Sequence, residues 1–259
     1  MCTSADVTPD ILPAALGLGV PVLVEKPVAW SSRQLEEICR KPHDRVIVGY
    51  NRRAYPSVRA AREEARKGPP LLAQMTLPKD VVAPEVPDPT AAYLRPFFES
   101  VSALGIDVAR FVLGDLRVDA VRRLHNPAGN LYGLAAILTT ERGDLLQLTG
   151  NLNAASNYAL TLNWPGRRFE LLPFEIATLY EGLEVIQPTP EYPVSRYSPK
   201  VSRRISLEGH DLVEKPGFVA EAIALKRLME GGSRDESSAS LEDALSVTKL
   251  CEELTGVTF

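Results

Sequence analysis

The chain has 259 residues and a formal net charge of −4, from 29 Lys and Arg against 33 Asp and Glu. Hydrophobic residues make up 45% and charged residues 24%, the balance of a globular protein that can bury a core. These values exclude a disordered chain, a collagen-like repeat and a polybasic nucleic-acid binder. The length fits one large domain or two smaller ones.

Compartment and metal binding follow from the cysteines, the histidines and the hydropathy. Cys2, Cys39 and Cys251 form no CxxC pair, which argues against a disulfide framework and a Cys-based zinc site. The three histidines have no ligand spacing, so we predict no metal site. The N-terminus lacks a basic signal-peptide region, and the longest uncharged apolar stretch, residues 11–24, is too short and too broken by Pro and Gly to span a bilayer. We expect a cytoplasmic protein with no membrane or nucleic-acid partner.

Helices and strands alternate over the first part of the chain. Ser31 with Gln34 is a plausible capping box for the second helix, and Gly68 follows the third. Such alternation predicts a parallel sheet with right-handed crossovers. The expected elements are a helix over 9–16, a strand over 20–24, a helix through 40, a strand over 45–50 and a helix over 55–67.

The pattern then changes to successive strands with short turns. Pro96 is expected to open a helix with apolar residues on one face, and two helices should close the chain. Residues 141–144 and 164–167 have hairpin-turn composition, which predicts an open, mostly antiparallel sheet with helices on one face. The expected strands are 71–77, 117–124, 131–140, 145–152, 159–164, 167–172, 176–180, 183–186 and 201–207, and the last helices are one with the stripe Phe218, Ala222, Leu225 and Met229 and one capped by Ser240 and Asp243.

Three motifs carry a resemblance to a known family. Glu25-Lys26-Pro27 ends a buried strand, Gly49-Tyr50-Asn51-Arg52-Arg53 ends the next, and residues 106–114 read IDVARFVLG. This arrangement resembles the Gfo/Idh/MocA family of NAD(P)-dependent sugar and cyclitol oxidoreductases over nearly the whole chain. The alternative is an unrelated α/β protein, because the triplet alone is weak and recurs at 214–216.

The resemblance implies an α/β fold whose second domain is α+β. Residues 1–54 are expected to form a partial Rossmann-like dinucleotide-binding domain with a parallel sheet. Residues 55–259 are expected to form an α/β substrate and dimerisation domain with a large open, mostly antiparallel sheet covered by helices.

The resemblance also implies NAD or NADP as cofactor, but the sequence lacks the phosphate-binding element. No strand is followed by G-x-G-x-x-G and a helix, and Gly17-Leu18-Gly19 follows a helix as a C-cap would. Compared with the family, the chain opens at the end of a central Rossmann strand and the first half of the cofactor domain is missing. Thr3 and Ser4 then correspond to the loop beside the nicotinamide. The expected cofactor contacts are Thr3, Ser4, Glu25, Lys26 and Pro27, and binding by this chain alone is doubtful.

Lys26 is the candidate catalytic residue. The family uses this lysine close to the nicotinamide and the substrate hydroxyl, and an ammonium there can polarise an oxygen or relay a proton. The alternative is an ordinary solvated lysine. The family's second catalytic element pairs a histidine with the aspartate at Asp107, but Leu104 stands three residues before it, so the imidazole acid/base is absent.

Further residues are candidates for binding a sugar-like or cyclitol-like ligand. Three of them follow the second strand and point to the inferred cleft, although Arg52 or Arg53 could instead bond loop carbonyls. Tyr93 lies in a Pro-rich loop that is a candidate lid, and Ser100 lies before Asp107. His210 lies in a loop before the penultimate helix, where a solvated His210–Asp211 pair is the alternative. The candidates are Tyr50, Asn51, Arg52, Tyr93, Ser100 and His210.

Three hypotheses for the function remain open. The first is an NAD(P)-dependent oxidoreductase whose missing half comes from an upstream segment, a partner chain or a mis-called start, and which is impaired or inactive alone. The second is a non-catalytic ligand-binding or partner subunit, as the missing imidazole suggests. The third is a fragment whose sheet edge near residues 20–24 needs covering by another chain. In each case the open antiparallel sheet is a natural surface for a homo-oligomer or partner chain.

Overall fold

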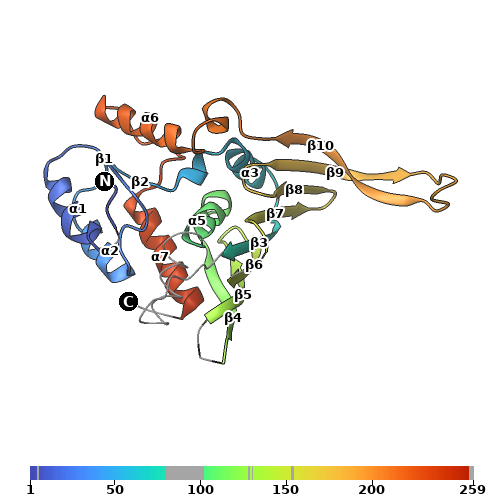
Figure 1. The fold of residues 1–259 in the computed structure, drawn as a ribbon, viewed down its shortest axis with the longest axis horizontal. Coiled ribbons are helices and arrows are strands. Elements are labelled where there is room, and N and C mark those ends of the chain that lie inside the picture. Colours follow the sequence, from blue (N-terminus) through green and yellow to red (C-terminus); the bar gives the residue numbers. More distant parts are fainter. Residues whose placement is uncertain (5, 80–101, 128, 130, 153–154, 257–259) are drawn as a thin grey trace.

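The computed structural model describes residues 1–259 except 5, 80–101, 128, 130, 153–154 and 257–259. A small two-stranded parallel sheet lies beside an eight-stranded, mostly antiparallel sheet, and helices pack between and around them (Figure 1). This arrangement confirms the predicted fold class. Among the described residues, no helix has both the length and the apolar character to cross a bilayer.

The small sheet is built from the alternating elements at the start of the chain. β1 and β2 are parallel, with Val22 opposite Val46 and Val24 opposite Val48. The Ser31 hydroxyl accepts a hydrogen bond from the Gln34 amide at 3.4 Å, which is one of the two hydrogen bonds of the predicted capping box. The elements are α1 (Thr8–Gly17), β1 (Val22–Val24), α2 (Ser32–Cys39), β2 (Val46–Val48), the 3-10 helix η1 (Asn51–Ala54) and α3 (Pro56–Lys67).

The large sheet has the order β10-β9-β8-β7-β3-β6-β5-β4. β3 pairs parallel with β6, and the other neighbours are antiparallel. Both predicted hairpin turns are confirmed, since they join β5 to β6 and β7 to β8. The strands are β3 (Leu72–Lys79), β4 (Arg117–His125), β5 (Leu131–Thr139), β6 (Leu145–Leu152), β7 (Ala159–Trp164), β8 (Arg167–Leu171), β9 (Ala177–Ile186) and β10 (Arg196–Ile205).

Two local predictions were wrong. The strands expected at 176–180 and 183–186 are one strand, β9, because pairing with β10 continues along both parts and the two strands project together beyond the rest of the sheet (Figure 1). In the helix α6 (Phe218–Met229), the buried residues are Glu221, Ala224 and Leu228. The expected stripe is rotated from this face, so Met229 is 67% exposed. Residues spaced three and four apart can lie on either of two neighbouring faces of a helix. The apolar residues of α6 indicated the face that is not buried.

The last helix, α7 (Leu241–Thr255), connects the small sheet to the rest of the molecule. The predicted capping box is present, because the Ser240 hydroxyl accepts from the Asp243 amide at 3.0 Å and the Asp243 carboxylate accepts from the Ser240 amide at 2.9 Å. Just before it, the Val48 amide of β2 donates to the Ala239 carbonyl at 2.9 Å. Residues near the C-terminus therefore extend the hydrogen bonding of the small sheet.

A buried ion-pair network holds these parts together. The Arg53 guanidinium on η1 donates to both carboxylate oxygens of Asp107, at 2.6 to 3.0 Å, and to Asp243 at 3.0 Å. Asp107 lies on α5 (Ser102–Leu113), which lies between α7 and the large sheet (Figure 1). Arg53 is 4% exposed and Asp107 is fully buried. One arginine thus joins η1, α5 and α7.

Replacing Asp107 with Asn should destabilise the protein by about 3 kcal/mol or more, because a buried guanidinium loses its charged partner. Urea unfolding followed by circular dichroism measures this loss. Asp115→Asn is the matched control, since Asp115 pairs with Arg110 but its side chain is 85% exposed, and it should cost less than about 1 kcal/mol. Equal losses in the two variants would contradict a structural role for the Arg53 network.

Candidate functional site

Three chain segments meet at one edge of the small sheet. The Met1 amino group donates to the Leu23 carbonyl at 2.5 Å and the Met1 carbonyl accepts from the Glu25 amide at 3.0 Å, so Met1 lies alongside Val24 like a residue of a parallel strand. On the other side of β1, the Gly49 amide donates to the Val24 carbonyl at 2.8 Å. The segments that begin at Cys2, Glu25 and Tyr50 therefore leave the sheet side by side, which is where open parallel sheets bind ligands.

The loop after Met1 folds onto the start of α1. The hydroxyls of Thr3 and Thr8 are 2.8 Å apart, and the Ser4 carbonyl accepts from the amides of Val7 and Thr8. The Trp30 indole donates to the Asp6 carboxylate at 2.8 Å, which ties this loop to the residues after Pro27. Thr3 and Ser4 thus lie in the same neighbourhood as Glu25, Lys26 and Pro27.

The helix starts beside the small sheet do not fit a pyrophosphate group. At α1 the first amides donate to the Ser4 carbonyl. At α2 the Ser32 amide donates to the Glu252 carboxylate at 2.8 Å, and the Ser32 hydroxyl donates to the same carboxylate at 2.7 Å. A carboxylate of α7 thus occupies the place where an anion would bind. Among the described residues, the starts of α1 and α2 therefore offer no cradle of free amides for phosphates.

Asn51 is fixed by the loop that carries His210. The Asn51 amide nitrogen donates to the Pro216 carbonyl at 2.7 Å, and the Gly217 amide donates to the Asp211 carboxylate at 2.9 Å. His210 itself is exposed in the 3-10 helix η2 (Gly209–Leu212). Asn51 of η1 and the loop that follows His210 are therefore in contact.

Tyr50 and Arg52 have different environments. Tyr50 belongs to the hydrophobic core, where burial raises the pKa of its hydroxyl well above the usual value. The Arg52 guanidinium lies over the Tyr158 ring at 4.8 Å, and that ring stacks on Phe174 at 5.0 Å. Among the described residues, the buried Nε of Arg52 has no hydrogen-bond partner. Arg52 thus brings an unsatisfied donor and an aromatic pair to this side of η1.

Glu221 is a candidate that sequence reasoning missed. It is 9% exposed on α6, and its burial, followed by the negative charge of Glu25, raises its pKa to about 8. The Glu25 carboxylate packs against Gly49, where an added Cβ would lie 3.2 Å from it. A carboxylic acid that stays protonated near neutral pH can donate a hydrogen bond to a ligand oxygen. The apolar stripe of α6 indicated a buried face without Glu221, whereas the face that is buried in the structure contains it.

Two candidates, Tyr93 and Ser100, lie outside the described residues. Leu104 is a core residue, 5% exposed, as the apolar stripe of its helix predicts. His43 contacts Glu242 of α7, and His125 ends β4. Within the described ranges, no three His, Cys, Asp or Glu side chains are grouped to hold a metal ion.

Glu221→Gln should make the protein less sensitive to alkaline pH. In the folded wild-type chain the carboxyl keeps its proton up to about pH 8, whereas in the unfolded chain it loses it near 4.5, so stability falls as pH rises between these values. Urea unfolding at pH 5 and pH 8.5 measures the effect, and the variant should lose less stability than the wild type over this interval. Glu230→Gln, an exposed residue at the end of the same helix, should behave as the wild type. Parallel losses in all three proteins would contradict a buried, protonated Glu221.

Comparison with known proteins shows the fold. No family model matches the chain, and no curated protein matches its sequence. A dehydrogenase from Chromobacterium violaceum has a TM-score of 0.72 and 18% identity, over 99% of this chain and 75% of that one. Levoglucosan dehydrogenase in complex with NADH and levoglucosan gives 0.69 and 16%, over 98% and 75%. A Gfo/Idh/MocA family oxidoreductase from Vibrio cholerae gives 0.65 and 19%, over 98% and 76%. The chain therefore has the fold of these dehydrogenases.

Proposed function

We propose that this chain is a homologue of the NAD(P)-dependent sugar and cyclitol oxidoreductases that keeps their ligand site and does not turn over a substrate alone. The observation that carries the proposal is the meeting of the segments after Met1, Val24 and Gly49 at one edge of a parallel sheet. A similar fold binds NADH and levoglucosan in levoglucosan dehydrogenase. Residues 1–54 are proposed as the partial cofactor domain and residues 55–259 as the substrate domain.

The proposed site binds a polyhydroxylated ligand through hydrogen bonds. Lys26 is the proposed catalytic group, and its ammonium donates to one ligand hydroxyl. Glu221 donates as a neutral acid, and Arg52 supplies a further charged donor. The other proposed ligand contacts are Asn51, His210, Tyr93, Ser100 and Tyr50. Of these, Tyr50 belongs to the hydrophobic core.

NAD or NADP is the proposed cofactor of the fold, with its nicotinamide end against Thr3, Ser4, Glu25, Lys26 and Pro27. The occupied helix starts at α1 and α2 do not suit its pyrophosphate. We therefore assign the isolated chain no hydride-transfer step. A second chain that supplies a phosphate cradle would restore it.

A specific observation favours a second candidate, a non-catalytic ligand-binding or partner subunit. Leu104 occupies the position of the family's histidine and is packed in the core. Exposed apolar residues on β9 and β10, Leu183, Val185 and Tyr197, support an oligomer or partner contact through the open sheet. The compartment proposed for either candidate is the cytoplasm, in keeping with the free thiols of Cys2, Cys39 and Cys251.

The test measures ligand binding and cofactor binding separately. A panel of sugars and cyclitols is screened by thermal shift without cofactor, and a ligand that raises the melting temperature is then titrated by calorimetry. Lys26→Gln should weaken its binding by about tenfold, the loss expected for one charge-assisted hydrogen bond. Lys200→Gln on β10 is the matched control, because Lys200 is exposed and follows Pro199, which pairs with Leu183 where β9 and β10 project beyond the rest of the sheet, and it should bind as the wild type.

NADH and NADPH fluorescence is then followed up to about millimolar cofactor. No quenching and no turnover is the expected result for the isolated chain. Turnover that Lys26→Gln abolishes would overturn the proposed lack of activity and establish an enzyme. Co-purification with a full-length homologue would support the partner-subunit candidate.

A further inference from the structure

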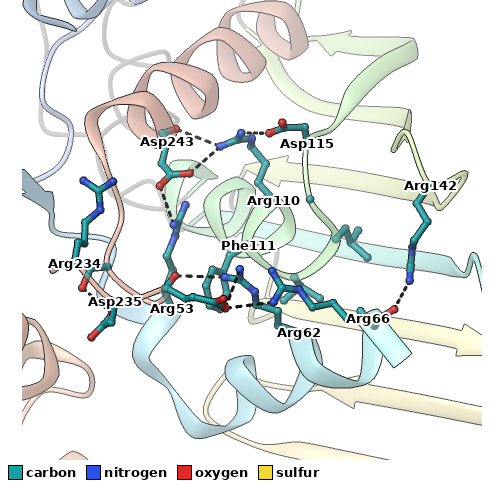
Figure 2. Close-up of a pocket in the computed structure, with 16 residues that line it drawn as sticks. Arg53, Arg62, Arg66, Arg110, Phe111, Asp115, Arg142, Arg234, Asp235 and Asp243 are labelled. Atoms are coloured by element: carbon teal, nitrogen blue, oxygen red, sulfur yellow. Dashed lines mark hydrogen bonds and ion pairs between the residues drawn. The ribbon is translucent and has the colours of Figure 1, made fainter. Parts of the chain in front are cut away.

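A cavity rich in arginine is lined by none of the proposed ligand-binding residues that the structure describes. Its volume is about 570 Å³, and it is bounded by α3, the end of α5, the loop before α7 and the start of α7 (Figure 2). Six arginines and four carboxylates line it. These charged residues are Arg53, Arg62, Arg66, Arg110, Arg142, Arg234, Asp115, Asp235, Glu236 and Asp243.

Several of these arginines are committed to buried carboxylates. Arg53 is held by Asp107 and Asp243, as described above. Arg142 donates to both oxygens of Asp144, at 2.5 and 3.0 Å, and Asp144 is fully buried. Such pairs are structural, because neither partner can move without leaving the other charge unpaired.

Arg62 and Arg66 are different, because they share one exposed carboxylate. They stand four residues apart on α3, so both side chains lie on the same face of the helix. Each places a guanidinium nitrogen 3.3 Å from the same oxygen of Glu236. These distances exceed the 2.7–2.9 Å typical of strong charge-assisted bonds, and the Glu236 side chain is 76% exposed. Glu236 therefore fills the space between the two guanidiniums only loosely.

Arg62 is held by an aromatic ring and has one hydrogen-bond donor without a partner among the described residues. Its guanidinium lies 4.0 Å from the centre of the Phe111 ring, which also lines the cavity and fixes the plane of the guanidinium (Figure 2). Its Nε is buried, and the described part of the chain provides no hydrogen-bond partner for it. Buried polar atoms without a partner are rare in native proteins and need an explanation. Burial and the neighbouring charge of Arg66 lower the pKa of Arg62, as expected for a cation that is incompletely neutralised.

We propose that Arg62 and Arg66 form a clamp for the phosphoryl group of a small metabolite, which displaces the Glu236 carboxylate. Two convergent guanidiniums carry two positive charges, which a phosphoryl dianion balances and a single carboxylate does not. The planar forks also offer the paired donors that phosphate oxygens accept. The cavity is larger than a bare phosphate ion, so the rest of the metabolite fits beside the clamp.

The proposal is tested by titrating the whole chain with glucose 6-phosphate, inorganic phosphate and glucose. Calorimetry at about 0.15 M ionic strength suppresses non-specific attraction. Glucose 6-phosphate should bind, and glucose should not bind at this site. Tighter binding of glucose 6-phosphate identifies a phosphorylated metabolite as the ligand, and binding of inorganic phosphate alone identifies the free ion. Absence of binding for both phosphates overturns the proposal.

Substitutions distinguish binding by Arg62 and Arg66 from attraction of the ligand to any positively charged surface. Arg62→Gln and Arg66→Gln should each weaken binding by about tenfold or more, the equivalent of one charge-assisted hydrogen bond. Glu236→Gln should strengthen it several-fold, because the competing charge is removed. Arg59→Gln changes the same charge on the same helix at an exposed position outside the cavity, and should leave the affinity unchanged.

The arginine substitutions are expected to lower the affinity and Glu236→Gln to raise it, so the clamp predicts changes of opposite direction. A loss in Arg59→Gln equal to that in Arg66→Gln, or a loss in Glu236→Gln, overturns the clamp. Arg66 is 57% exposed and Glu236 is 76% exposed, so these two variants are expected to fold even where Arg62→Gln does not. Circular dichroism of each variant checks that it is folded before titration.

Discussion

The buried ion pair between Arg53 and Asp107 is the constraint on which the rest of the structure depends. A guanidinium this deeply buried is tolerated only with charged partners in good geometry, and Asp107 and Asp243 supply them from two other helices. Because Arg53 lies within η1, two residues after Asn51, the pair also sets the position of η1. Asn51 and Arg52 of η1 are candidate ligand contacts, and α3, which begins at Pro56, carries Arg62 and Arg66 of the arginine-lined cavity.

Local patterns in the sequence predict the fold class and most of its elements. The alternation of helices and strands up to Lys67 predicts a parallel pair, and β1 and β2 form one. Short turns predict the antiparallel pairing of β5 with β6 and of β7 with β8. The capping box at Ser240 is likewise local, since its two hydrogen bonds span three residues. Such features depend on neighbours in the chain, so a single sequence contains the information needed to find them.

Features that depend on distant residues were beyond the sequence. Arg53 and Asp243 are 190 positions apart, and nothing in either neighbourhood indicates the other. Glu64 stands in a run of charged residues with no local sign of burial, yet it is 6% exposed and accepts a hydrogen bond from Arg167 of β8 at 2.8 Å. Glu221 was overlooked for the same reason, because its environment is formed by Glu25 and the core around it. The motif positions alone predict a candidate site, whereas its electrostatics required the three-dimensional arrangement.

The contact between Gly217 and η1 gives a marker for comparing chains of this fold. Gly217 has a φ of +81°, and a Cβ there would lie 2.2 Å from the Asn51 carbonyl oxygen. A side chain at this position therefore requires both a different backbone conformation and a displaced loop. In an evolving lineage, glycine at 217 should be retained as long as the loop before α6 packs against the backbone of η1. A chain that has replaced this glycine has also moved the loop relative to Asn51, so its ligand preference should not be inferred from this protein.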